Sequence, residues 1–180
     1  IVLLGPVMGE LEEAFAPVFR LSMLGIGAQG WLRRPGRNNQ VRPIMPADFH
    51  AHNMLRNARA LFLSDEDIPP GEAAPALTYW SDNVQLIAFT RGDGGADVCV
   101  RGNWRHIDAF PAKVVDPTGA GDVFAAAFLI RLWESGDVWK ATRFATCAAS
   151  FSVEGEGTSA IPTREQIEAR LKEHPNIVAR

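Results

Sequence analysis

The chain has 180 residues, of which 47% are hydrophobic and 22% are charged, so it can bury a real core and is not composed like a disordered tail. Its formal net charge is −3, and the 18 Lys and Arg residues are spread along the sequence. This distribution gives no basic surface for nucleic acid or for an anionic membrane, and it favours small ligands. Cys99 and Cys147 stand apart and in no metal-ligand spacing, which favours free thiols in a cytoplasmic protein.

Short apolar runs alternate with helical patterns through the first half of the chain. We expect strands at residues 1–4, 21–24, 60–63 and 84–90, and helices at residues 10–19, 46–59 and 71–81. The run at 84–90 is apolar on both faces, as central strands of parallel sheets are. The first run ends at Gly5-Pro6 and is too short for a signal peptide or a membrane span. Because it begins at residue 1 without an initiating Met, we expect upstream residues to be missing.

The second half begins with a hairpin pattern and ends with helices. Alternating runs at 96–101 and 104–110 flank Gly102-Asn103, which predicts a β-hairpin. Helices are expected at 119–133, 138–153 and 163–173, with Asp137 and Thr163 as N-caps. The whole pattern predicts one α/β domain over residues 1–180, with three α/β/α layers and a mainly parallel sheet.

The segment from Asp116 to Asp122 reads Asp-Pro-Thr-Gly-Ala-Gly-Asp and precedes an apolar helical run. Gly119 and Gly121, on either side of Ala120, permit a sharp turn and close approach to a ligand, and the free amides of a helix start suit a phosphate. A carboxylate beside an anion is unfavourable unless it accepts a proton from the group that attacks that anion. The pattern therefore indicates phosphoryl transfer; a well-capped helix is the simpler alternative.

The same segment resembles the active-site signature of the ribokinase-like (PfkB) carbohydrate kinases, Asp-x-Thr-Gly-Ala-Gly-Asp. The resemblance extends over residues 60–162 and implies a ribokinase-like, Rossmann-like fold with a β-hairpin before the active-site helix. It implies Asp122 as general base, and the amides of Gly119, Ala120 and Gly121 as the anion hole. The implied reaction is transfer of a phosphoryl group from ATP, with Mg²⁺, to an alcohol group of a sugar or related polyol.

The resemblance also implies nucleotide contacts. Thr90, Gly92 and Gly95 match a Thr-x-Gly-x-x-Gly segment that lines the nucleotide site of the family, although a glycine turn before a hairpin would look the same. Thr146 stands on a helix that borders the adenine pocket in relatives, at a position often occupied by Asn. Small residues on that helix are otherwise explained by close helix packing.

Metal contacts are implied in the same way. Asp67 fits the acidic position of an Asn-x-x-Glu segment and is expected near magnesium, through water; Ser64 replaces the Asn, and a solvated turn is the alternative. Asp116, Thr118 and Gly157 are implied to hold a monovalent cation such as K⁺.

Relatives begin with a region that carries further strands, a glycine-rich sugar-contacting motif and a small β lid, none of which is recognisable in this sequence. We therefore expect the chain alone to be inactive as an enzyme. The expected partner is a sugar or polyol acceptor, with no nucleic acid and no membrane, and with a homodimer as a candidate assembly.

Two other functions are open at this point. The segment from Gly25 to Gly30 spells the dinucleotide fingerprint Gly-x-Gly-x-x-Gly and would suit an NAD-dependent oxidoreductase, but residues 31–36 read as a strand and turn where that motif needs a helix. The departures at Ser64 and Thr146 would also suit a non-catalytic nucleotide-binding relative.

Overall fold

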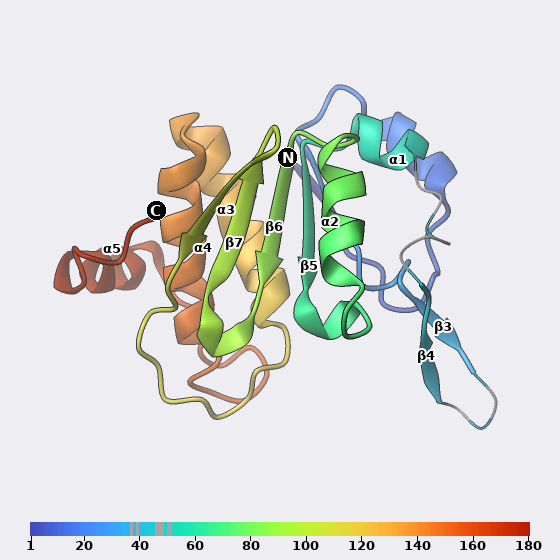
Figure 1. The fold of residues 1–180 in the computed structure, drawn as a ribbon. Helices are drawn as coiled ribbons and strands as arrows, with labels where there is room; N and C mark the ends of the chain where they lie inside the picture. Colours follow the sequence, from blue (N-terminus) through green and yellow to red (C-terminus); the bar gives the residue numbers. More distant parts are fainter. Residues whose placement is uncertain (37, 39, 46–48, 50–51) are drawn as a thin grey trace. The chain divides into compact units, whose positions relative to one another are not determined.

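The structure is a computed structural model that describes every residue except 37, 39, 46–48, 50 and 51 (Figure 1). The contacts group the chain into two compact units. Unit 1 contains Ile1–Arg91 and Cys99–Trp104, and unit 2 contains Gly92–Val98 and Arg105–Arg180. The single domain expected from the sequence stays a prediction, and each unit is described by itself.

Unit 1 is built on four parallel strands. In spatial order these are β1 (Val2–Leu4), β2 (Leu24–Gly27), β5 (Ala60–Ser64) and β6 (Leu86–Thr90). Leu3 is opposite Gly25 and Leu61 is opposite Ile87 in the parallel register. The predicted parallel sheet is therefore present, and three of the four predicted strands overlap the observed ones closely.

The second strand lies three residues further along than predicted. Leu21 is 93% exposed, whereas Leu24 and Ile26 are fully buried and alternate with Gly25 and Gly27 inside β2. The prediction of a strand at 21–24 was wrong because the glycines were interpreted as the start of a loop. In the structure Gly25 and Gly27 are strand residues, and they leave the face of β2 opposite Leu24 and Ile26 without side chains at these two positions.

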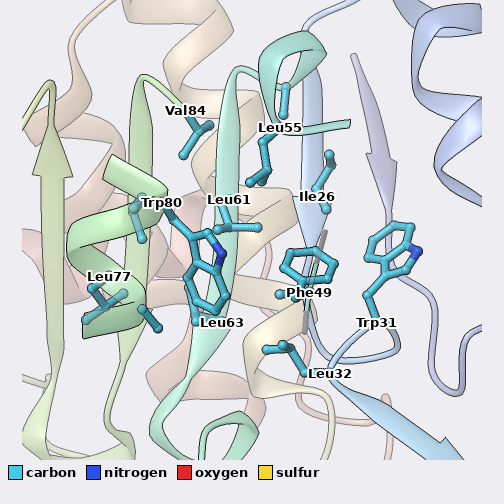
Figure 2. Close-up of a cluster of buried hydrophobic side chains, with 14 of the residues drawn as sticks. Ile26, Trp31, Leu32, Phe49, Leu55, Leu61, Leu63, Leu77, Trp80 and Val84 are labelled. Carbon is cyan, nitrogen blue, oxygen red and sulfur yellow. The ribbon is translucent and has the colours of Figure 1, made fainter. Parts of the chain in front are cut away.

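One face of this sheet supports a hydrophobic core (Figure 2). Leu61 and Leu63 of β5 belong to a buried cluster with Trp80 from helix α2 (Ala73–Ser81), and Phe49 packs edge-on against the Trp80 ring at 5.8 Å between centroids. The intervening residue Phe62 is also buried. Burial of consecutive residues is typical of a central parallel strand. Replacing a fully buried Trp by Ala costs about 3–5 kcal/mol in general, so this packing is a major part of the stability of unit 1.

The other elements of unit 1 are short. The predicted helix at 10–19 is the 3₁₀ helix Glu13–Phe19, which contains Pro17, a residue without the N–H that an α-helix needs there. Of the predicted helix at 46–59, the structure shows α1 (His52–Asn57), while residues 46–48, 50 and 51 lie outside the described part. Strands β3 (Arg33–Pro35) and β4 (Val41–Pro43) form a separate antiparallel pair.

A β-hairpin follows β6, as predicted. It consists of β7 (Ala96–Val100) and β8 (Asn103–Ile107), and its turn residues are Arg101 and Gly102, both with positive φ (49° and 82°). The turn was predicted one residue later, at Gly102-Asn103. The tip of the hairpin belongs to unit 1 and its base to unit 2.

Unit 2 consists mainly of three helices, α3 (Ala120–Ser135), α4 (Val138–Ser152) and α5 (Arg164–Glu173). The Asp137 carboxylate accepts from the Trp139 and Lys140 amides, and Thr163 caps α5 with a capping box. Both predicted N-caps are therefore confirmed. Figure 1 shows α3 and α4 side by side, joined by a tight turn.

The carboxyl-terminal segment is fixed to unit 2 by hydrogen bonds. The Arg143 guanidinium of α4 donates to the carbonyl oxygens of Ile177, Leu171 and His174 at 2.6–2.8 Å. The amide and carbonyl groups of Arg180 pair with those of His106 in β8, both at 2.9 Å. Within the described residues, no helix has the length and apolar character required to cross a membrane.

Candidate active site

The loop before α3 is tied to a second loop of unit 2 by one carboxylate. Asp116 Oδ1 accepts from the Thr118 amide at 2.9 Å, and Oδ2 accepts from the Gly157 amide at 3.1 Å. The Asp116 amide itself donates to the Val153 carbonyl oxygen at 3.2 Å. The hydrogen bonds that the Asp116 carboxylate accepts, from Thr118 first and then from Gly157, lower the pKa of Asp116 below its ordinary value. Three residues implied as one site by the sequence, Asp116, Thr118 and Gly157, are thus brought together.

The start of α3 presents free backbone donors. Gly119 has φ +81° and begins the helix, and a Cβ added at Gly119 or Gly121 would have nothing within 4 Å. Among the described residues, the amides of Gly119, Gly121 and Asp122 have no hydrogen-bond acceptor, whereas the Ala120 amide donates to the Pro117 carbonyl oxygen at 3.2 Å. Such an exposed set of N–H groups at a helix start suits an anion, with Ala120 serving the turn instead.

Asp122 lies in the first turn of this helix and is exposed. In the part of the chain that the structure describes, its carboxylate has no hydrogen-bond or ion-pair partner. It therefore stays available to a ligand group placed at the helix start, as a general base must. The same exposure means that unit 2 alone does not shield this carboxylate from water.

The second loop is supported by a contact that the sequence analysis missed. Arg170 of α5 donates to Glu154 Oε2 at 2.8 Å and to Ser150 Oγ at 2.9 Å, and its guanidinium lies 3.4 Å from the centre of the Phe151 ring. This arrangement fixes the residues that lead into the loop of Gly157. No local sequence pattern predicts the ion pair between Arg170 and Glu154, because the two residues are 16 positions apart and lie on different elements.

In unit 1, polar residues gather where β5 and β6 end. Asp67 is only 5% exposed; its Oδ1 accepts from Arg33 at 3.1 Å, and its Oδ2 accepts from the Ser64 amide and hydroxyl at 2.9 and 3.0 Å. Ser64 is opposite Thr90 in the sheet, and the Thr90 hydroxyl donates to the Leu63 carbonyl oxygen at 3.4 Å. The contacts of the Asp67 carboxylate with Arg33 and Ser64 therefore give this residue a structural role. The Ser-x-x-Asp spacing is a capping-box signal that could have revealed this contact.

The residues expected to contact the nucleotide have different surroundings. A Cβ at Gly95 would lie 2.1 Å from the Ile107 carbonyl oxygen, so this glycine is required by the close approach of β8. Gly92 also has positive φ, but the space around it is open. Thr146 is buried, and its hydroxyl donates to the Thr142 carbonyl oxygen of its own helix at 2.9 Å. Gly92 is thus the member of this group whose surroundings leave room for a ligand.

The dinucleotide fingerprint at Gly25 to Gly30 does not form a dinucleotide site. Gly25 and Gly27 lie within β2, and the segment is followed by β3 (Arg33–Pro35), not by a helix. A Cβ at Gly30 would lie 2.3 Å from the carbonyl carbon of Pro6, which explains that glycine by backbone packing. The helix amides that would bind a pyrophosphate are missing from this position of the described chain.

Comparison with known proteins identifies the family. The model of the pfkB family carbohydrate kinases matches residues 58–164, which is more than half of the chain. The chain therefore belongs to the pfkB family of carbohydrate kinases, and the match includes the Asp116 to Asp122 segment. The predicted fold class and family membership are confirmed.

Individual relatives are sugar kinases by name. The chain is 48% identical over 98 residues to a ribokinase of Bacillus subtilis and 41% identical over 99 residues to a deoxyribokinase of Salmonella typhi; each match covers 54% of this chain and 30% or 32% of the relative. The structure of Arabidopsis thaliana ribokinase complexed with ribose and ATP matches with a TM-score of 0.73 at 21% identity, over 95% of this chain and 55% of that chain. This last likeness shows the fold. The matched residues cover only about a third of the length of these two curated relatives.

Proposed function

We propose that the protein to which this chain belongs transfers the γ-phosphoryl group of ATP to a hydroxyl of a sugar or related polyol. The observation that carries this proposal is the start of α3, where exposed, unpaired amides of Gly119, Gly121 and Asp122 adjoin the free Asp122 carboxylate. An anion site beside a base is the arrangement that phosphoryl transfer to an alcohol requires. Family membership and the names of the relatives support the same reaction.

In the proposed reaction, the acceptor hydroxyl oxygen forms a bond to the γ-phosphorus while the bond from this phosphorus to the bridging oxygen breaks, and ADP leaves. The hydroxyl proton passes to a carboxylate oxygen of Asp122. The amides at the start of α3 donate to the equatorial phosphoryl oxygens, whose charge must be stabilised in the transition state. Asp122 contributes mainly by removing the proton late, because the transition state is loose.

Magnesium fits the site as an ion held mostly by the nucleotide and by water. Among the described residues, no cluster of three His, Cys, Asp or Glu side chains could enclose a metal ion. Mg²⁺ usually keeps several waters and binds substrate phosphates, where it neutralises charge on the transferring group. In this proposal Asp67 contacts a magnesium-bound water while it keeps its bonds to Arg33 and Ser64.

A monovalent cation is a further part of the proposal. The Asp116 carboxylate, the Thr118 hydroxyl and the Gly157 carbonyl are hard oxygen donors in one place, held there by the bonds from Asp116. K⁺ bound to these oxygens would add positive charge near the α3 amides. Activity measured in K⁺, Na⁺ and choline salts of equal ionic strength tests this part; equal rates in all three would contradict it.

The experiment that tests the function is Asp122→Asn in the longest expressible form of the protein. We expect the turnover number for sugar phosphorylation to fall by a factor of about 10²–10⁴, as for other general bases, while the affinity for ATP changes little. Glu168→Gln, an exposed charge removal on α5, is the matched control and should have no effect. A variant at Asp122 that keeps a tenth of the normal rate would refute the assignment of the base.

The 180-residue chain by itself is proposed to lack turnover, because the sugar-contacting elements expected of the family are not recognisable in it. Calorimetric titration of this chain with ATP and Mg²⁺, without acceptor, tests nucleotide binding separately from catalysis. Sugar phosphorylation by this chain alone would refute the proposed inactivity.

A further inference from the structure

A cavity of about 460 Å³ lies in unit 1, at the end of the sheet where β5 and β6 begin. Its wall comes from the end of α1, from the last residue of α2 and the four residues after it (81–85), and from the hairpin turn at Arg101 and Gly102. The segment Thr90 to Gly95, expected to contact the nucleotide, follows the opposite end of β6. The five residues of that strand separate its two ends by roughly 13–17 Å. None of the residues of the proposed phosphoryl-transfer site lines this cavity.

Two arginines, Arg56 and Arg101, are among the residues that line this cavity. Within the described residues, neither has a carboxylate within ion-pair distance, although several other arginines of the chain do have one. The guanidinium of Arg59 lies nearby and contacts Gln85, another residue of the wall. Two arginines without an ion-pair partner in one concave surface suit an oxyanion, especially a phosphoryl group.

Arg101 occupies a backbone conformation that disfavours it. Its φ is +49° in the tight turn of the hairpin, a position at which Asn, Asp or Gly is preferred. Its amide donates to the Gln85 carbonyl oxygen at 3.0 Å, which fixes the turn against the cavity wall. An arginine at a position where a residue such as Asn would fit better points to a use for its side chain.

The rest of the wall offers hydrogen-bonding groups instead of more positive charge. Asp82, Ser81 and Gln85 contribute a carboxylate, a hydroxyl and an amide. The helix carbonyls at the end of α2 are already engaged, since Thr78 accepts from Ser81 Oγ at 2.7 Å and Tyr79 accepts from the Asn83 side chain at 2.8 Å. A carboxylate on the same wall as two arginines disfavours a bare polyanion but accepts hydrogen bonds from hydroxyl groups.

We propose that this cavity binds a small phosphorylated polyol, with its phosphoryl group between Arg56 and Arg101 and its hydroxyls against Asp82 and Gln85. The site is independent of the proposed catalysis. It can be occupied whether or not the α3 amides bind a phosphate.

Ribose 5-phosphate is the probe, titrated into the isotope-labelled 180-residue chain while amide resonances are followed one by one. We expect saturable shifts of the Gln85, Arg101 and Gly102 amides, with a dissociation constant of about 0.1–1 mM. Ribose and inorganic phosphate, titrated separately, should each bind at least about tenfold more weakly. The amides of Gly119 and Gly121 report phosphate binding at α3 separately, so the two sites are distinguished.

Arg101→Asn is the decisive variant, because Asn tolerates positive φ and the fold is kept. We expect its affinity for the probe to fall at least about tenfold and its thermal midpoint to rise. Arg56→Gln should weaken binding similarly, and Arg20→Gln, an exposed arginine outside the cavity, should not. Unshifted amides at Gln85, Arg101 and Gly102, or unchanged affinity in both cavity variants, would overturn the proposal.

Discussion

Two glycines of unit 2 share the same φ and have opposite surroundings, which makes them a matched pair. Gly119 and Gly95 both have φ +81°, but a Cβ at Gly119 meets open space whereas a Cβ at Gly95 lies 2.1 Å from the Ile107 carbonyl oxygen and 2.9 Å from the Ala109 amide nitrogen. Replacement by Ala costs about 1–2 kcal/mol at either position for the left-handed conformation alone. At Gly95 the overlap adds about 1–3 kcal/mol because β8 must move. We therefore expect a loss of about 1–2 kcal/mol for Gly119→Ala and of about 2–5 kcal/mol for Gly95→Ala.

Urea denaturation of the two variants measures these losses, and titration with ATP and Mg²⁺ measures their binding. Gly119→Ala should stay folded but place a methyl group where the phosphoryl group is proposed to bind, so its affinity for ATP should fall at least about tenfold. Equal losses of stability in the two variants would refute the argument from the Ile107 contact. Normal ATP affinity in folded Gly119→Ala would refute the placement of the phosphate.

Three further changes test other contacts of unit 2. Because the pKa of Asp116 is lowered in the folded chain, its contribution to stability is present above the ordinary Asp pKa and is lost as the pH falls through the lowered value. The resonance of the Gly157 amide, which donates to this carboxylate, should therefore move only below about pH 4. A shift near pH 7 would contradict this. In Arg143→Met, three carbonyl oxygens lose a charged donor. We therefore expect faster hydrogen exchange in residues 171–177 and a free energy of unfolding in urea that is lower by about 1–3 kcal/mol. Unchanged exchange would exclude Arg143 as the residue that fixes this segment. Asp137→Ala should cost about 1 kcal/mol as the N-cap of α4, with Asp137→Asn as a nearly neutral control; equal losses would argue against capping.

Features specified by neighbouring residues were predictable from the sequence. The caps Asp137 and Thr163 and the helices that follow them depend on spacings of two or three residues, so local chemistry determines them. The turn at Gly119 and the helix after it were predictable for the same reason. The candidate anion site is therefore mostly a local structure.

Features that depend on tertiary packing were not predictable in the same way. The second strand was predicted three residues too early. Its position is decided by pairing with β1 and β5, for which Leu24 and Ile26 must be the buried residues. The ion pairs that hold the site are also long-range: Arg33 with Asp67 and Arg170 with Glu154. A single sequence gives no sign of which charged residues will meet.

Nor could the sequence separate glycines that serve the fold from glycines that leave room for a ligand. Gly92 and Gly95 belong to the same short motif, yet only Gly95 is in contact with another strand. Ala120 likewise belongs to the anion-hole motif, but its amide is used within the turn. Distances to neighbouring backbone atoms make these distinctions, and they exist only in the folded chain.

The most deeply buried tryptophans lie in unit 1, and this has a practical consequence. Trp80 is fully buried in unit 1 and Trp31 is nearly so, whereas Trp133 in unit 2 is 65% exposed. Unfolding of unit 1 should therefore shift the fluorescence emission strongly to the red, while circular dichroism follows chiefly the long helices of unit 2. If the two optical signals melt at different temperatures, the units unfold as separate cooperative blocks; if the curves superimpose, the 180 residues unfold in one step.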